Sequence, residues 1–366
     1  MKEKVKSICM AVGFLLVIIG LGLAFLIIPD KEISVSERRK LIGFPEASLK
    51  TVSSGEWFGE FDKYMLDQFP LRDELRMIKA ISEYGLFAKA DNNGIYISEG
   101  YVCKTDYPLD EDAVTEGCEK LNQLYNDYFG GATAYYSIIP DKNYFLAEKS
   151  GHLCVDYDKL FSAVDECLDN KFKYIDIISC LNIDNYYKTD LHWKQQDIIP
   201  VADRILAEMK MSIPKRSYSQ MTLTPFYGAY FGQAALPISP DELTYLDNES
   251  LEKCTVYNPL KNTYSTIYET EAFGGIDSYD IFLSGAESLL IIDNPDNPEG
   301  DELYIIRDSF SSALTPLIIE SCSKIVLIDP RYIATENIMK YLNPAENAKV
   351  LFIFSTSILN KGYLFK

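Results

Sequence analysis

The sequence predicts an α/β protein with a mostly parallel sheet and helices on both of its faces. Near the C-terminus, the apolar runs "LYIIRDS", "KIVLIDP" and "KVLFIFS" alternate with the helical stretches "FSSALTPLIIESC" and "TENIMKYL". Earlier, the same alternation predicts a helix at 111–128, a strand at 132–139, a helix at 157–170 and a strand at 173–177. Such alternation is typical of strand–helix–strand units, whose parallel strands are covered on both sides.

Residues 8–28 predict a transmembrane helix. They hold no charged and no strongly polar side chain, and at 1.5 Å rise per residue they span roughly 30 Å, the thickness of a bilayer core. A cleavable signal peptide is the alternative, but its apolar region is shorter, roughly 7–15 residues, and ends at a small-residue site. Because "FLIIPDKE" offers no such site, we expect residues 1–29 to be a cytoplasmic tail and an uncleaved signal anchor.

The tail before the span favours a cytoplasmic N-terminus, because it carries Lys2, Lys4 and Lys6. Basic residues also follow the span, but long domains are translocated largely regardless of charge. We therefore expect a single-pass protein of the cell membrane whose main domain is extracytoplasmic.

The charge of the chain limits its partners. The formal net charge is −19, of which residues 1–29 contribute +2, so the remainder carries −21. Such a domain is repelled by nucleic acid and by anionic lipid surfaces. We expect a substrate that is neutral or locally steered.

Cysteine and histidine usage argues against metal sites. Of eight cysteines, Cys9 lies in the membrane segment, and the remaining seven cannot all pair within one chain. No C-x-x-C spacing occurs, and the chain holds two histidines. A disulfide framework, a zinc site and a histidine-rich metal site are therefore not supported, and we expect no cofactor.

The chain between the membrane and the α/β region predicts a stalk. Within residues 30–90, a polar linker is followed by aromatic and apolar residues at helical intervals, until Pro70 interrupts the pattern. Residues 91–366 form the main domain, which opens with a hairpin in "GIYISEGYV". Residues 211–286 are rich in Tyr, Gly, Ser and Thr and predict a strand-rich insertion or lid.

Two segments are expected at the carboxyl edge of the sheet, where open parallel sheets bind ligands. In "TDLHW", an extended backbone would place Asp190 and His192 on the same side, so the carboxylate could orient the imidazole as a general base. In "LYIIRDSFSSALTP", Ser309 follows a buried strand and precedes a helix whose first free N–H groups could stabilise an oxyanion. By type, a nucleophile, a base and an orienting acid are all present.

Each of these residues also has a structural interpretation. Asp190 and Ser309 can be simple helix caps, and His192 a surface histidine. Trp193 can be a core aromatic or a platform for substrate. The 26 tyrosines suit a carbohydrate-binding surface, although strands use tyrosine anyway.

Several motifs together resemble one family. In order, "SERRKLIGFP", "YMLDQFPLRDELR", "IIPDKN", "YYKTDLHW", "RDSFSSALTPLI" and "IVLIDPRY" resemble the DHHW protein family, from about Val35 to the C-terminus. That family is related to the SGNH-hydrolase-like O-acetyltransferases of alginate biosynthesis. The resemblance implies a flavodoxin-like three-layer sandwich with a catalytic triad in the order Asp190, His192, Ser309.

Two positions depart from the family pattern. Leu191 stands where the second histidine of the name-giving motif is found, and Arg307 where SGNH enzymes usually carry glycine. Besides the triad, we expect substrate contacts from Trp193, Lys142, Asn143 and Arg307.

The resemblance implies an enzyme that acetylates a cell-surface or exported polysaccharide. Ser309 would take an acetyl group and pass it to a sugar hydroxyl, with a membrane-bound O-acyltransferase as the possible acetyl donor. Two alternatives remain open. The chain could be a carbohydrate acetylesterase that uses the same triad, or a non-catalytic protein that binds polysaccharide or acts as a scaffold in the cell envelope.

Overall fold

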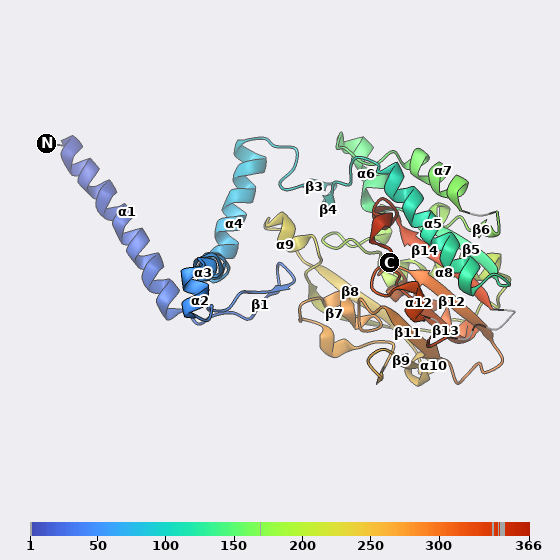
Figure 1. Cartoon of the computed structure of the whole chain (residues 1–366). Helices are drawn as coiled ribbons and strands as arrows, with labels where there is room; N and C mark the ends of the chain where they lie inside the picture. Colours follow the sequence, from blue (N-terminus) through green and yellow to red (C-terminus); the bar gives the residue numbers. More distant parts are fainter. Residues whose placement is uncertain (1, 169, 339, 343, 345–347) are drawn as a thin grey trace. The chain divides into compact units, whose positions relative to one another are not determined.

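The computed structural model of the chain describes residues 2–168, 170–338, 340–342, 344 and 348–366. The chain divides into two compact units (Figure 1). The first comprises residues 1–89 and 235–237, and the second comprises 90–234 and 238–366.

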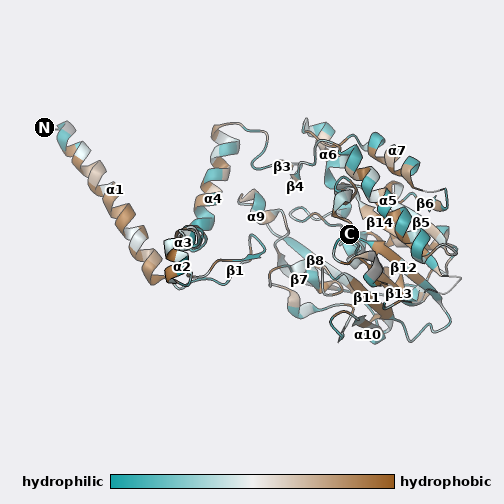
Figure 2. Cartoon of the chain, viewed as in Figure 1, coloured by the Kyte–Doolittle hydropathy of each residue, from teal (hydrophilic) through white to brown (hydrophobic). Residues whose placement is uncertain are grey.

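The first unit begins with helix α1, Lys2–Ile27, which is apolar over most of its length (Figure 2). Among the described residues, its segment Lys4–Ile27 is the one helix long and apolar enough to cross a membrane. It ends before Pro29, whose ring cannot continue a helix. By length and composition this helix fits a membrane anchor, and an N-terminal signal sequence has the same properties.

The rest of the first unit is mostly helical, with one short strand pair. Its elements are β1 Ile33–Ser34, β2 Arg39–Lys40, α2 Leu49–Ser53, α3 Glu56–Asp67, α4 Arg72–Ile81 and a π-helical turn at Ser82–Leu86. The predicted amphipathic helix is α3, and its rings pack together: Trp57 stacks on Phe61 with centroids 5.0 Å apart. The helix stops at Asp67 because Pro70 cannot supply a helical N–H.

The second unit is built on an eight-stranded sheet with the order β10-β9-β11-β13-β12-β14-β5-β6. In chain order its strands are β5 Thr133–Ile139, β6 Phe172–Tyr174, β9 Thr255–Asn258, β10 Thr263–Ser265, β11 Leu289–Asp293, β12 Asp301–Arg307, β13 Cys322–Ile328 and β14 Lys349–Ser355. The strands from β13 to β6 run parallel, and Ile305 of β12 lies opposite Leu351 of β14. The edge from β11 to β10 is antiparallel.

Both faces of the sheet are buried, so the unit has three layers. On β12, Leu303 and Ile305 join one hydrophobic core, and the alternate residues Tyr304 and Ile306 join the other, as the period of two in a strand requires. Helix α8, Ile199–Glu208, contributes to the first core. Helices α5, Glu111–Tyr128, and α7, Tyr157–Cys167, contribute to the second. The mixed α/β fold with a mostly parallel sheet is as predicted.

The segment 211–286 contains four strands, two of which belong to the large sheet. Strands β7, Ser219–Phe226, and β8, Asp241–Asp247, pair as a hairpin, whereas β9 and β10 extend the large sheet. The predicted hairpin near residue 95 is β3 and β4. The remaining elements are β3 Ile95–Ser98, β4 Tyr101–Lys104, α6 Lys142–Ser150, α9 Phe231–Ala234, α10 Glu249–Lys253, α11 Ser311–Leu314, α12 Thr335–Ile338 and α13 Thr356–Leu359.

Two helices expected beside the site are shorter than predicted. The helix after Ser309 is a single α-helical turn, α11, followed by 3₁₀ turns at 315–317 and 319–321. Pro316 lacks the N–H that a longer α-helix would need. The sequence after Trp193 predicts a second helix, from about Lys194 to Met209. The structure has a 3₁₀ turn at Gln195–Asp197, and α8 begins only at Ile199, with Pro200 in its first turn.

Candidate active site

The candidate site lies at the carboxyl ends of three adjacent parallel strands. Strands β12, β14 and β5 neighbour one another in that order. Two residues beyond the last residue of each strand lie Ser309, Ser357 and Asp141, respectively. The topology therefore gathers one hydroxyl or carboxylate from each strand at a single edge of the sheet, the usual place for a ligand.

Ser309 is held in a tight turn by the residue before it. The buried Asp308 accepts hydrogen bonds from the backbone N–H of Phe310 at 3.0 Å and from that of Ser355, at the end of β14, at 2.7 Å. Its carboxylate thus ties the turn to the neighbouring strand. Ser309 itself stays partly exposed, so its hydroxyl can be reached from solvent.

His192 lies between Ser309 and Asp190. Its Nε2 is 2.8 Å from Ser309 Oγ, and its Nδ1 is 2.6 Å from Asp190 Oδ1. A carboxylate accepts hydrogen bonds only, so the ring proton belongs on Nδ1 and Nε2 can accept the proton of the serine hydroxyl. The imidazole is 3% exposed. The structure therefore places the three residues in one hydrogen-bonded chain.

The carboxylate of Asp190 is fixed by the backbone on both sides. Oδ1 also accepts the His192 N–H at 2.9 Å, and Oδ2 accepts the Ala229 N–H at 2.7 Å. Gly228 makes this approach possible, because a Cβ at that position would lie 2.4 Å from Asp190 N. Such a contact is far shorter than van der Waals distance, so a side chain at 228 would displace the loop.

A second carboxylate braces the loop that carries these residues. Asp241, the first residue of β8, accepts hydrogen bonds from the N–H groups of Lys188 at 3.0 Å and Thr189 at 2.7 Å. The Tyr230 N–H donates to the carbonyl of Thr189 at 2.9 Å. The hairpin region 219–247 therefore supports the loop of His192.

The imidazole of His192 is also packed between two aromatic rings. Tyr279 stacks on it in parallel, with centroids 3.8 Å apart and an interplanar angle of 3°. Phe310 lies against it at 4.9 Å and 60°. These rings restrict rotation about the side-chain bonds of His192 and keep water from one face of the imidazole.

Trp193 and Arg307, from which we expected substrate contacts, are both buried, with 0% exposure. The Trp193 Nε1–H donates to the carbonyl of Phe310 at 2.9 Å. The indole therefore links the segment that carries His192 to the segment that carries Ser309. Arg307 lies behind the serine turn and donates to Ser312 Oγ at 3.1 Å. Neither side chain lines the small pocket described next, and their expected contacts with substrate stay a prediction.

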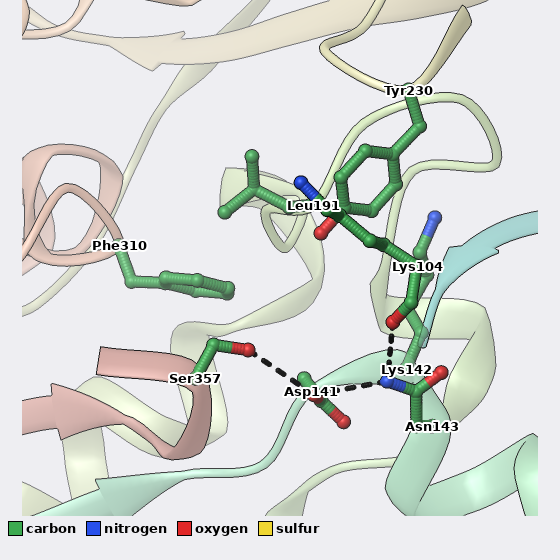
Figure 3. Close-up of a pocket in the computed structure, with 8 residues that line it drawn as sticks. All are labelled: Lys104, Asp141, Lys142, Asn143, Leu191, Tyr230, Phe310 and Ser357. Atoms are coloured by element: carbon green, nitrogen blue, oxygen red, sulfur yellow. Dashed lines mark hydrogen bonds between the residues drawn. The ribbon is translucent and has the colours of Figure 1, made fainter. Parts of the chain in front are cut away.

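Lys142 and Asn143 do line a small pocket, with a volume of about 50 Å³ (Figure 3). Its walls are Lys104, Asp141, Lys142, Asn143, Leu191, Tyr230, Phe310 and Ser357. Leu191 precedes His192 and Phe310 follows Ser309, so the pocket lies beside the hydrogen-bonded chain. Figure 3 shows the apolar Leu191 and Phe310 on one side and the polar groups of Asp141, Ser357 and Asn143 on the other.

The polar groups of this pocket are strongly constrained. Lys142 is buried and its Nζ donates to the carbonyls of Tyr187 and Lys188, each at 3.1 Å; burial lowers the pKa of its ammonium group. Burial raises the pKa of the Asp141 carboxyl, which accepts hydrogen bonds from Tyr157 Oη at 2.5 Å and Ser357 Oγ at 3.2 Å.

The N–H groups that are free beside Ser309 differ from those that we expected. The N–H groups of Phe310 and Ser312 are already bonded, to Asp308 Oδ1 and to the carbonyl of Ser309, respectively. Asn143 uses its amide hydrogens on the Lys104 carbonyl and on Asp141. The Ser309 N–H has no hydrogen-bond acceptor among the described residues, so it is a free donor beside the hydroxyl.

Comparison with known proteins identifies the family. The sequence model of the DHHW protein family matches residues 146–328, half of the chain, and includes both halves of the site. The chain belongs to the DHHW protein family. No curated protein matches the chain.

Solved structures share the fold of the second unit. A DHHW family protein from Eubacterium siraeum is similar with a TM-score of 0.60 and 19% identity, over 74% of this chain and 93% of that one. PatB1 of Bacillus cereus is similar with a TM-score of 0.58 and 16% identity, over 75% of this chain and 99% of PatB1. PatB1 with a sulfonyl adduct gives a TM-score of 0.56 at 16% identity, over 72% of this chain and 97% of that one. At these identities the likeness shows the fold.

Sequence reasoning missed several residues of the site. Asp141 and Ser357 follow strands that the sequence predicts, so the rule that ligands gather at strand ends could have found them. Tyr279 and Gly228 lie in the strand-rich segment and carry no sequence signal for their contacts with His192 and Asp190. Their positions depend on how the segment folds back over the site.

Proposed function

We propose that this DHHW family protein is a membrane-anchored O-acetyltransferase that modifies a polysaccharide outside the cytoplasm. The observation that carries the proposal is the continuous hydrogen-bonded chain from Ser309 through His192 to Asp190. Nucleophile, base and orienting acid with this geometry constitute the arrangement used for acyl transfer through a covalent intermediate.

In the proposed reaction, His192 Nε2 takes the proton of Ser309 as Oγ attacks the acetyl carbonyl. The Asp190 carboxylate stabilises the imidazolium that forms. The free Ser309 N–H stabilises the oxyanion of the tetrahedral intermediate. The donor then leaves with the proton from His192, and an acetyl ester remains on Ser309.

In the second half of the reaction, a sugar hydroxyl attacks this ester. His192 takes the proton of the hydroxyl, and Ser309 regains its own proton when the acetyl group departs. The pocket beside Leu191 and Phe310 offers Asp141 and Ser357 as hydrogen-bonding groups for the acceptor. A neutral sugar is compatible with the charge of −19, which repels polyanions.

The location and the donor follow from the same proposal. Helix α1 anchors the chain by a single pass, with the α/β unit on the extracytoplasmic side. Acetyl groups must then cross the membrane, and a membrane-bound O-acyltransferase is the partner that could deliver them. An acetylesterase is the second candidate, because Ser309 is partly exposed and water could reach its acyl ester.

The test is turnover of a chromogenic acetyl ester by the full-length protein in detergent, with and without a carbohydrate acceptor. We expect Ser309→Ala and His192→Ala to lower kcat/KM by about 10³-fold or more, whereas Ser323→Ala on β13 keeps the normal rate. Acetylated sugar identifies a transferase, and acetate alone identifies an esterase. Equal rates in all variants, or no turnover with several donors, would overturn the proposal.

A further inference from the structure

Two cysteines of the second unit lie side by side on packed helices. Cys118 is on α5 and is fully buried, and Cys167 is the last residue of α7 and is partly exposed. Helices α5 and α7 pack along one another on the same face of the sheet (Figure 1). The Cys167 thiol is close enough to Cys118 to add to the effect of burial, which raises the pKa of the Cys118 thiol.

The contacts around Cys167 fix its place on α5. Its Sγ lies 3.7 Å from the carbonyl oxygen of Thr115, and its own carbonyl accepts a hydrogen bond from Asn122 Nδ2 at 2.8 Å. Residues 115, 118 and 122 are three and four positions apart, so they share one stripe of the helix. Cys118 is therefore the α5 side chain that lies between the two contacts made by Cys167.

We propose that Cys118 and Cys167 are a disulfide-forming pair that links α5 to α7 when the protein meets a disulfide oxidant. The bond would close a loop that contains β5 and α6, and with them Asp141, Lys142 and Asn143 of the pocket. This inference concerns the stability and oxidation of the unit and does not depend on acetyl transfer.

The chemistry is thiol–disulfide exchange. The sulfur of the partly exposed Cys167 attacks one sulfur of a small disulfide, forms a mixed disulfide and releases one thiol. The Cys118 sulfur then attacks the Cys167 sulfur and releases the second thiol, so two protein thiols are oxidised and one disulfide is reduced to two thiols. Because burial and the neighbouring Cys167 thiol raise the pKa of Cys118, closure should accelerate toward alkaline pH.

The remaining cysteines provide internal comparisons. Cys254 Sγ faces the carbonyl of Ser250 at 3.4 Å, and Cys322 Sγ faces that of Ile318 at 3.8 Å. Both thiols are directed at the backbone of their own segment. Cys180 is partly exposed, as Cys167 is, but it has no contact with the α5 stripe that carries Cys118 among the hydrogen bonds described. It is therefore a matched control for access of the oxidant to a thiol.

The experiment uses the full-length protein, equilibrated in detergent with glutathione disulfide at pH 8. Free thiols are blocked under denaturing conditions, and tryptic peptides are analysed by mass spectrometry. Because a lysine or arginine separates each of the seven cysteines beyond the membrane segment from the next, every pairing gives a distinct cross-linked mass. We expect the peptides of Cys118 and Cys167 to be joined, with the other cysteines alkylated or in mixed disulfides.

Thermal unfolding gives the second measurement. Oxidation should raise the midpoint by roughly 4–10 °C, since the bond closes a loop of about 50 residues, and dithiothreitol should reverse the shift. The shift should vanish in Cys167→Ser and Cys118→Ala and persist in Cys180→Ser. A joined pair other than Cys118 and Cys167, a glutathione adduct that stays on Cys167 without closure, or a shift unchanged in Cys167→Ser would overturn the inference.

Discussion

At the scale of single residues, Asp190 decides which nitrogen of His192 carries the proton. Asparagine at this position can present an amide N–H to Nδ1, which would move the ring proton to Nε2 and remove the base that Ser309 needs. We predict that Asp190→Asn lowers kcat/KM for an acetyl ester by about 10²–10⁴-fold. Asp197→Asn, in the following 3₁₀ turn, is the control and should be near normal. Equal activity of the two variants would contradict the role given to Asp190.

The lack of a side chain at Gly228 allows the chain to approach Asp190 closely. Because an added Cβ would lie 2.4 Å from Asp190 N, Gly228→Ala should displace the loop and break the bond from Ala229 N–H to Asp190. We predict a loss of at least about 10-fold in kcat/KM together with a lower thermal midpoint. Gly131→Ala is the matched control, since nothing lies within 4 Å of its Cβ position. Similar behaviour of the two variants would argue against the close approach.

Tyr279 tests whether stacking positions the base. Among the described residues, its buried hydroxyl has no hydrogen-bond partner, so Tyr279→Phe should keep both the stack and the activity. Tyr279→Leu removes the ring. It should lower kcat by up to about 10-fold, the factor that corresponds to the free energy of a good aromatic pair, and should change KM little. Loss of activity in Tyr279→Phe would show instead that the hydroxyl takes part in the reaction.

At the scale of elements, the carboxylate of Asp67 at the end of α3 contributes to the pH dependence of the first unit. A hydrogen bond from Arg39, at 2.5 Å to Oδ1, lowers the pKa of Asp67 below its ordinary value. The folded state therefore favours the ionised form. This contribution to stability is complete above the ordinary aspartate pKa of about 3.9 and is lost as pH falls through the lower folded value.

The two tryptophans allow this to be measured, because Trp57 lies in the first unit and Trp193 in the second. In a Trp193→Phe chain, Trp57 fluorescence during urea unfolding should show a lower midpoint at pH 3 than at pH 6. Asp67→Asn should reduce this difference, and Asp62→Asn, at an exposed position of the same helix, should not. If the difference between the urea midpoints at pH 3 and pH 6 is unchanged in Asp67→Asn, the pair of Asp67 and Arg39 is not the cause of this difference.

Sequence patterns located the elements better than their ends. The helix at 111–128 and the strand at 132–139 agree with α5 and β5 nearly to the residue, because apolar periodicity and caps such as Asp110 mark them clearly. The length of the helix after Ser309 is overestimated, because an apolar run of residues is compatible with an α-helix and with successive 3₁₀ turns. The Asp-x-His motif predicts the contact between Asp190 and His192, because its local spacing alone allows the carboxylate to reach the imidazole.

At the scale of the whole molecule, local sequence patterns do not predict the features that depend on contacts between residues far apart in the chain. The contact of His192 with Ser309, 117 positions apart, is implied by the family resemblance, whereas the residue pattern alone only places both segments at the same edge of the sheet. The burial of Trp193 and Arg307 follows from packing around the serine turn. In the sequence, a tryptophan beside a candidate base suggests a platform for sugar, but its neighbours in space decide whether the ring is exposed.

The most direct test of the account is whether Ser309 carries the acetyl group. The full-length protein is mixed with an acetyl ester, quenched in acid within its first turnovers, and digested for peptide mass spectrometry. We predict one acetyl group on the peptide that contains Ser309, absent in Ser309→Ala and strongly reduced in His192→Ala. Acetylation of another residue, or turnover by the wild-type protein without an acetyl group on Ser309, would contradict it.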